Sequence, residues 1–272
     1  MAPFFGRLIE TQPERPQVFV EPFAGGAGTA LRLLIDEYVD HAVINDLDPG
    51  IAAFWRCVFV RTEDLAQLIE SAEITVEAWH GHHSAYTSRR HGGDDLELGF
   101  ATFFLNRTNR SGILGARPIG GLGQSGTWKI DARFNRANLA ERVRTLGRYR
   151  NRVTVAEEDG IALVTRFLDP RHFVYADPPY LLRGSDLYLN TLTWADHQRL
   201  AKLLATARGR WLVTYDRDPR VPELYPGSRL AEFSIAHTAS RQHVGQEFAV
   251  FADSIIVDAL DGLGRSARFV SG

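Results

Sequence analysis

The stretch that decides the fold is VFVEPFAGGAG, residues 18–28. Its first three residues are β-branched or aromatic, which predicts a short buried strand. The glycines that follow allow the backbone to approach a ligand closely, because they carry no Cβ. A helical pattern runs from Thr29 to Val39, and a second predicted strand, His41 to Ile44, ends in Asn45-Asp46. This order of strand, glycine loop, helix and acid-terminated strand opens a nucleoside-binding α/β fold.

The glycine loop narrows the choice of nucleoside. A phosphate-binding loop needs a lysine after its last glycine, but Gly28 is followed by Thr29. The dinucleotide motif needs a third glycine where this chain has Leu31. S-adenosylmethionine carries no phosphate and needs close backbone approach and acidic partners, for which Asp46 and Asp159 are candidates. A nicotinamide-dependent enzyme is the alternative, although it leaves the features described next unexplained.

A second decisive stretch is Asp177-Pro178-Pro179-Tyr180, which follows the apolar run Phe173 to Ala176. The prolines stop the predicted strand and hold the backbone extended. They leave the Asp177 carboxylate and backbone carbonyls as free acceptors for an amino group. Tyr180 offers a ring face to a base, a contact of about 1–3 kcal/mol. Taken alone, the tetrapeptide also fits a type I turn with an aspartate cap.

The rest of the chain predicts an interrupted α/β domain. Further helices are expected from Ile51 and over Glu63–Ala72, Glu77–Arg89, Ile161–Phe167 and Ala195–Ala207, and further strands over 153–155, Trp211–Asp216, Leu230–Ile235 and Phe248–Phe251. The last two strands should pair antiparallel at one sheet edge, and no element is assigned after Asp253. We expect a catalytic domain over residues 1–60 and 150–272, and an insertion over residues 61–149 with a glycine-rich loop at 115–126.

Composition limits the class of protein. The chain has 272 residues, 44% of them hydrophobic, and one cysteine, Cys57. It can therefore form no internal disulfide and no cysteine-based zinc site, which fits a reducing cytoplasm. No signal peptide and no apolar run of about 18 residues is found, so no membrane span is expected. The histidines at 80, 82, 83 and 91 lack organised carboxylates, and we interpret them as polar surface rather than a metal site.

Charge is distributed unevenly along the chain. Residues 89–152 hold 13 Lys and Arg against five Asp and Glu, a net charge of +8, and since the whole chain carries −2 the remainder carries −10. A basic segment in an acidic body favours a polyanionic partner bound at one place. For the arginines at 142–152 a solvated helix face is the alternative.

Taken together, Glu21–Gly28, Asn45–Pro49, Phe104–Arg107 and Asp177–Tyr180, in this order and spacing, resemble the Dam-type (alpha-group) DNA adenine-N6 methyltransferases. The similarity extends to 187–190, 196–200, 213–216 and Glu247, and so covers most of residues 18–252. It implies an S-adenosylmethionine-dependent, Rossmann-like mixed sheet with an inserted, mainly helical target-recognition domain.

The resemblance also implies roles for individual residues. Cofactor contacts are implied for Phe23, Gly25, Gly26, Gly28, Asp46 (the ribose), Asp159 (the adenine ring) and Asp177. Asp177 and the Pro178 carbonyl would accept the hydrogens of the target amine, with Pro179 completing the rigid bend and Tyr180 stacking on the target base. DNA contacts are implied for Asn106, Arg107, Arg110 and Lys129.

Other residues are expected to have structural roles. Phe103, Phe104 and Leu105 are expected in the core, and Trp128, Trp194 and Trp211 are expected as core or edge aromatics rather than base stacks. The pattern Thr193-x-x-Asp196-His197 indicates the start of a helix and a packing or capping role for His197. Tyr188 and Asn190 are candidates for a loop that closes over the target base.

The implied function is site-specific transfer of a methyl group from S-adenosyl-L-methionine to N6 of an adenine flipped out of double-stranded DNA. A cytoplasmic monomer is expected, with a paired restriction endonuclease as a candidate partner. A catalytically weak or inactive DNA-binding relative and an RNA adenine methyltransferase are the alternatives. One departure concerns the N-terminal Gly-Gly-Lys or Gly-Ser-Lys motif of the family, since Phe4-Phe5-Gly6-Arg7-Leu8 contains no lysine.

Overall fold

The computed structural model describes residues 1–88, 95–179, 192–237 and 243–271. The chain forms two compact units, each treated by itself below. Among the described residues, unit 1 comprises 1–47, 156–179, 192–237 and 243–271, and unit 2 comprises 48–88 and 95–155. The catalytic and target-recognition roles expected for the two parts of the chain stay predictions.

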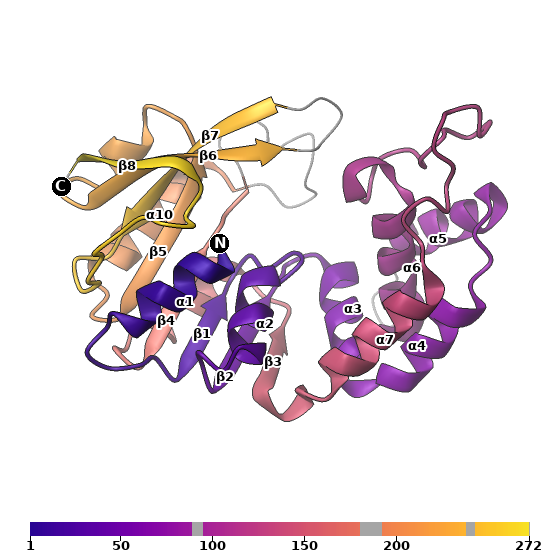
Figure 1. Cartoon of the computed structure of the whole chain (residues 1–272), viewed down its shortest axis with the longest axis horizontal. Helices are drawn as coiled ribbons and strands as arrows, with labels where there is room; N and C mark the ends of the chain where they lie inside the picture. Colours follow the sequence, from indigo (N-terminus) through magenta and orange to yellow (C-terminus); the bar gives the residue numbers. More distant parts are fainter. Residues whose placement is uncertain (89–94, 180–191, 238–242, 272) are drawn as a thin grey trace. The chain divides into compact units, whose positions relative to one another are not determined.

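An eight-stranded mixed sheet organises unit 1 (Figure 1). Its strands are β1 (Val18–Glu21), β2 (His41–Asn45), β3 (Val153–Ala156), β4 (His172–Ala176), β5 (Arg210–Asp216), β6 (Arg229–His237), β7 (His243–Phe251) and β8 (Arg265–Ser271), in the order β3-β2-β1-β4-β5-β7-β6-β8. β1 is parallel to β2 and β4, and β4 is parallel to β5. β7 is antiparallel to β5 and β6. Every strand predicted from the sequence is present, and the mixed α/β sheet has the Rossmann-like architecture that was expected.

The sheet edge differs from the prediction. β6 and β7 pair antiparallel, as expected, but β8 pairs antiparallel with β6 and forms the edge instead. Residues 265–271 have the sequence RSARFVS, which is too short and too polar to predict a strand by itself. Their strand exists because β6 presents an unpaired ladder of backbone groups that β8 satisfies.

Helices on opposite faces cover the sheet of unit 1. They are α1 (Ala2–Glu10), α2 (Gly28–Ile35), α8 (Gly160–Val164), α10 (Trp194–Ala205) and α11 (Val221–Leu224). The predicted helix at 29–39 stops early, since Glu37 takes a positive φ of 61°. α10 begins in a capping box of Thr193 and Asp196, and its His197 is fully buried, as the sequence predicted.

α1 packs on the centre of the sheet, although no element was predicted for its residues. The ring of Phe5 lies 5.3 Å from that of Phe19, 5.5 Å from that of Phe173 and 4.7 Å from that of Tyr175. Phe5 is fully buried, and burial of such a side chain contributes about 1.5–3 kcal/mol. On the other face, the ring of His197 on α10 packs against the ring of Tyr215 on β5, with 5.5 Å between the ring centres. Both faces of β1, β4 and β5 are therefore buried, as parallel strands require.

Unit 2 is mainly helical. It contains α3 (Pro49–Val60), α4 (Thr62–Ser71), α5 (Val76–Ser88), α6 (Asp95–Thr108), η1 (Arg110–Gly112), α7 (Arg136–Gly147) and η2 (Arg150–Arg152). Phe103, Phe104 and Leu105 are buried on α6, which confirms their predicted core role. None of the helices in the described ranges has the length and apolar character needed to cross a bilayer.

The direction of the chain connections changes at the centre of the sheet. β1 leads to β2 on one side, whereas β4 leads to β5 on the other. β1 and β4 are neighbours in the sheet, and Val20 of β1 lies beside Val174 of β4. The next residues along these two strands are Glu21 and Tyr175. Ligands of open α/β sheets bind outside the carboxyl ends of the strands at such a switch point. The fold therefore directs attention to the residues after β1 and β4.

Candidate functional site

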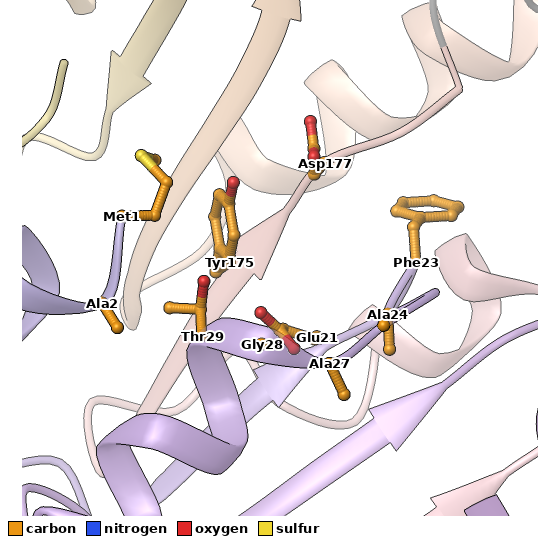
Figure 2. A pocket seen from close by; sticks show the side chains of 11 residues that line it. Met1, Ala2, Glu21, Phe23, Ala24, Ala27, Gly28, Thr29, Tyr175 and Asp177 are labelled. Atoms are coloured by element: carbon orange, nitrogen blue, oxygen red, sulfur yellow. The ribbon is translucent and has the colours of Figure 1, made fainter. Parts of the chain in front are cut away.

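A pocket of about 470 Å³ lies at this switch point (Figure 2). It is lined by Met1, Ala2, Glu21, Phe23, Ala24, Gly26, Ala27, Gly28, Thr29, Tyr175 and Asp177. Small-molecule sites commonly measure about 300–1,000 Å³. The pocket thus brings together the glycine loop and the aspartate after β4, two stretches that the sequence analysis selected independently.

The glycine loop is shaped by two left-handed residues and one side chain. Gly25 has φ +47° and Ala27 has φ 47°, and Ala27 serves as the N-cap of α2. The Gly25 N–H donates to Oδ2 of Asp46 at 3.0 Å. A Cβ placed on Gly25, Gly26 or Gly28 would meet no atom within 4 Å. The glycines therefore leave space beside the loop for a ligand, and Asp46 fixes the shape of the loop through the Gly25 N–H.

Phe23 and Asp159 are brought close together by a glycine. A Cβ on Gly160 would lie 2.6 Å from Cε1 of Phe23 and 2.7 Å from the carbonyl oxygen of Pro22, so only glycine fits there. Asp159 caps α8 by accepting from the N–H of Ala162 at 2.7 Å. The Phe23 ring projects beside the pocket (Figure 2). An aromatic ring and a carboxylate thus lie beside the loop, and the contact of Asp159 with the adenine ring stays a prediction.

Asn45 joins the three loops that surround this region, a role that the sequence analysis missed. Its Nδ2 donates to the carbonyl oxygens of Pro22 at 2.8 Å and Glu158 at 3.0 Å, and its Oδ1 accepts from the Glu158 N–H at 3.0 Å. The side chain is 1% exposed, so each of these bonds is protected from water. Its position directly before Asp46 was the only signal in the sequence.

Glu21 is the second residue that the sequence analysis left without a role. It is 5% exposed, and its Oε2 has no hydrogen-bond partner among the described residues. Burial raises the pKa of this carboxyl to about 8; the N–H of Ala30 opposes the shift and the charge of Asp177 adds to it. A buried acceptor without a donor is costly. A buried carboxyl group with an unpaired oxygen at the wall of a pocket favours the binding of a cationic ligand.

Asp177 follows β4 and reaches the same pocket (Figure 2). Its Oδ1 accepts from Oγ1 of Thr214 at 2.7 Å, and the residue is exposed at the pocket mouth. The surrounding protein raises the pKa of Asp177 by desolvation, and the Thr214 hydrogen bond opposes the rise. Pro178 is buried and Pro179 is half-buried. Tyr180 lies outside the described residues, as do Tyr188 and Asn190, so their expected roles stay predictions.

In unit 2 the expected DNA-contacting residues surround a compact loop after α6. Nδ2 of Asn106 donates to the Gly112 carbonyl at 3.1 Å. The guanidinium of Arg107 donates to the carbonyl of Arg133 at 3.1 and 2.8 Å. Arg133 returns hydrogen bonds to the carbonyls of Asn106 and Asn109 at 2.8 and 2.6 Å. Asn106 and Arg107 therefore hold the loop itself, whatever else they contact.

Arg110 and Arg117 extend from the same loop. The Arg110 N–H donates to the Arg117 carbonyl at 3.1 Å, so the two residues lie opposite each other. Both are exposed, and neither forms an ion pair with an acid in the described ranges. By contrast, Arg144 is paired with Glu63 at 2.8 Å and with Glu70 at 2.6 Å. Part of the basic segment is thus structural, and part is available to a polyanion.

Trp128 and Lys129 belong to a second, glycine-rich loop. Lys129 Nζ donates to the carbonyls of Gln124 at 2.6 Å and Gly126 at 3.0 Å, and the Gln124 side chain donates to Ile119 and Gly121 at 2.8 and 2.6 Å. Trp128 is 73% exposed, so the expectation of a core or edge aromatic is wrong for this residue. The indole projects because Lys129 and Gln124 fix the loop beneath it.

Comparison with known proteins places these observations in a family. The family model described as D12 class N6 adenine-specific DNA methyltransferase matches residues 1–242. Among solved structures, the chain is similar to the rRNA methyltransferase aviRa from Streptomyces viridochromogenes, at 16% identity and a TM-score of 0.39, over 92% of this chain and 82% of that one. That similarity is too low to carry an argument about function. A search of curated proteins found no match.

Proposed function

Because the chain belongs to the family of D12 class N6 adenine-specific DNA methyltransferases, we propose that it transfers a methyl group from S-adenosyl-L-methionine to N6 of an adenine flipped out of double-stranded DNA. The observation that carries the proposal is that Glu21, the open glycine loop and Asp177 meet in one pocket. An alternative nicotinamide-dependent function would leave both carboxyl groups without a task.

The residues of the pocket fit a nucleoside that carries an α-amino acid. Its ammonium group would bind the Glu21 carboxylate, which has an acceptor to offer at Oε2. The nucleoside would lie over Gly25, Gly26 and Gly28, where no Cβ obstructs it. The Phe23 ring would pack on the adenine, with Asp159 near its edge and Asp46 toward the ribose. When bound, S-adenosylmethionine supplies an electrophilic methyl group on a sulfonium.

Asp177 would prepare the amine for attack. The lone pair of adenine N6 is delocalised into the ring, so the amine is a weak nucleophile until its hydrogens are held out of that conjugation. Asp177 and the rigid carbonyl of Pro178 would accept those hydrogens. Their negative charge also favours the positive charge that develops on nitrogen. Desolvation by the surrounding protein raises the pKa of Asp177, which favours its taking the proton that N6 loses once the methyl group has been transferred.

DNA would bind through unit 2. Arg110 and Arg117 suit phosphates, because both guanidinium groups are exposed and lack an acidic partner among the described residues. Trp128 would contact bases or sugars from its rigid loop, since an exposed indole loses little entropy there. Extrusion of the adenine costs a few kcal/mol, which such contacts would offset. Monomeric action in the cytoplasm and a paired restriction endonuclease belong to the same proposal and rest on the resemblance of the motifs.

The test is incubation with S-adenosylmethionine and either mixed-sequence DNA or RNA of the same sequence, followed by analysis of modified bases. N6-methyladenine in DNA, confined to one sequence context, is expected. Asp177→Asn should abolish it while S-adenosylmethionine binding stays within a few-fold, since the amide keeps the size of the carboxylate. Methylation of RNA alone, or near-normal turnover by Asp177→Asn, would contradict the proposal. DNA binding without turnover by the wild-type protein would favour an inactive relative.

A further inference from the structure

Two hydroxyl groups support the Asp177 carboxylate from inside the sheet. Oγ1 of Thr214, on β5, donates to Oδ1 of Asp177 at 2.7 Å, and Oη of Tyr175, on β4, lies 3.3 Å from the same Oγ1. Thr214 is 1% exposed and Tyr175 is 7% exposed. Water therefore competes little for these two hydroxyl groups. Tyr175, Thr214 and Asp177 thus form a chain of hydrogen bonds that runs from the buried strands to the pocket.

The direction of this chain follows from counting protons. A threonine hydroxyl has one proton to donate, and an ionised carboxylate can only accept. When Asp177 is ionised, Thr214 must donate to it and can only accept from Tyr175. The phenol therefore donates to Thr214, and Thr214 donates to Asp177. This order of donation, from Tyr175 to Thr214 to Asp177, is the one in which each of the two hydrogen bonds has one donor and one acceptor.

One oxygen of Asp177 remains for the pocket. Thr214 occupies Oδ1, and within the described part of the chain no donor reaches Oδ2. We propose that Thr214, backed by Tyr175, is a positioning residue that holds the Asp177 carboxylate so that Oδ2 faces the target amine as its acceptor. The proposal rests on the proposed function. It adds that the acceptor geometry is set by β5 and not by the Asp-Pro-Pro-Tyr stretch alone.

The surrounding charges make the effect of Thr214 measurable. Desolvation raises the pKa of Asp177, whereas the Thr214 hydrogen bond lowers it. The other titratable groups near these three side chains are Glu21 on β1, Glu247 on β7, which raises the pKa of Tyr175, and the amino group of Met1, which lines the same pocket. Of the interactions that act on Asp177 itself, the Thr214 hydrogen bond is the one that lowers its pKa. Removal of the Thr214 hydroxyl therefore leaves the effects that raise the pKa unopposed.

The experiment compares two substitutions at one position. Thr214→Val removes the hydroxyl at nearly constant shape and is expected to lower kcat about 10- to 100-fold, the range for a lost hydrogen bond to a charged acceptor. Thr214→Ser keeps the hydroxyl and should stay within about threefold of wild type. Tyr175→Phe, one bond further away, should cost about three- to tenfold. In Thr214→Val the acidic limb of the kcat profile should move to higher pH, with S-adenosylmethionine affinity unchanged.

A second readout requires no substrate. The carboxyl pKa of Asp177, followed by carbon NMR of aspartate-labelled protein and assigned with Asp177→Asn, should rise in Thr214→Val and not in Thr214→Ser. An unchanged pKa in Thr214→Val, or a Thr214→Ser variant as impaired as Thr214→Val, would overturn the proposal. If Thr214→Val does not fold, the same titration in Tyr175→Phe decides. A wild-type protein that transfers no methyl group would refute the proposed function, while the titration would still test the hydrogen-bond chain.

Discussion

Glu21 predicts that S-adenosylmethionine binding releases a proton. Its carboxyl has a pKa of about 8 in the free protein, because it is buried and Asp177 lies nearby. At pH 7 about nine in ten molecules therefore carry the proton. A ligand ammonium at Oε2 stabilises only the ionised form, so binding should drive the proton off. Ionisation of Glu21 at pH 7 costs about 1.4 kcal/mol, which corresponds to about tenfold in affinity.

Calorimetry in buffers of different ionisation enthalpy measures this proton directly. At pH 7 the wild-type protein should release about 0.9 proton more than Glu21→Gln, a difference that cancels protonation changes of the ligand itself. Glu21→Gln should also bind S-adenosylmethionine more weakly, since an amide attracts an ammonium less than a carboxylate does. Arg110→Ala, which lies in unit 2, serves as the control and should retain the release. Equal proton release by wild type and Glu21→Gln would refute the assignment of Glu21.

The same pKa has a consequence for stability without ligand. Between the ordinary glutamate pKa of 4.5 and the folded-state value of about 8, the folded protein keeps a proton that the unfolded chain has lost. A rise in pH through this window therefore favours unfolding. The free energy of unfolding contributed at Glu21 should fall from about pH 4.5 to 8, and the Glu21→Gln variant should lack that part of the decline. Urea titrations of both proteins across this window check the sign.

The remaining predictions concern the loop packing and the DNA surface. Gly160→Ala should destabilise the protein by about 1–3 kcal/mol and weaken S-adenosylmethionine binding, because its Cβ would lie 2.6 Å from the Phe23 ring; Gly115→Ala, where a Cβ meets nothing within 4 Å, is the matched control in thermal denaturation. Arg110→Ala should weaken DNA binding and reduce the salt slope by about 1, whereas Arg144→Ala, which loses only its ion pairs to Glu63 and Glu70, should leave both unchanged. Trp128→Ala should lower DNA affinity by about 1–3 kcal/mol with no change in salt slope. Equal effects of Arg110→Ala and Arg144→Ala on the slope would contradict the assigned surface.

Local pattern was sufficient for most of the sheet. The apolar runs before Glu21, Asp46 and Asp177 predicted β1, β2 and β4, because buried parallel strands need continuous apolar residues. The capping box of Thr193 and Asp196 likewise marked the start of α10. In each case the residues that make the element lie next to one another, so a short window of sequence contains its cause.

Elements whose cause lies far away in the chain were missed. β8 depends on the open edge of β6, and α1 depends on aromatic residues of β1 and β4. The exposure of Trp128 depends on the hydrogen bonds that Lys129 and Gln124 make beneath it. A window of sequence contains none of these partners. The residue type alone therefore suggested a core or edge aromatic, whereas the structure has an exposed indole at Trp128.

By itself the sequence determined the family, the strands β1 to β7 and the two stretches that meet at the pocket, because spacing and residue type carry that information. Only the tertiary structure decided what surrounds each carboxyl group. The burial of Glu21 and the Thr214 hydrogen bond to Asp177 arise from strands β1, β4 and β5, which are far apart in sequence and adjacent in the sheet. A pKa depends on those neighbours, and hence on the fold rather than on the residues that precede and follow.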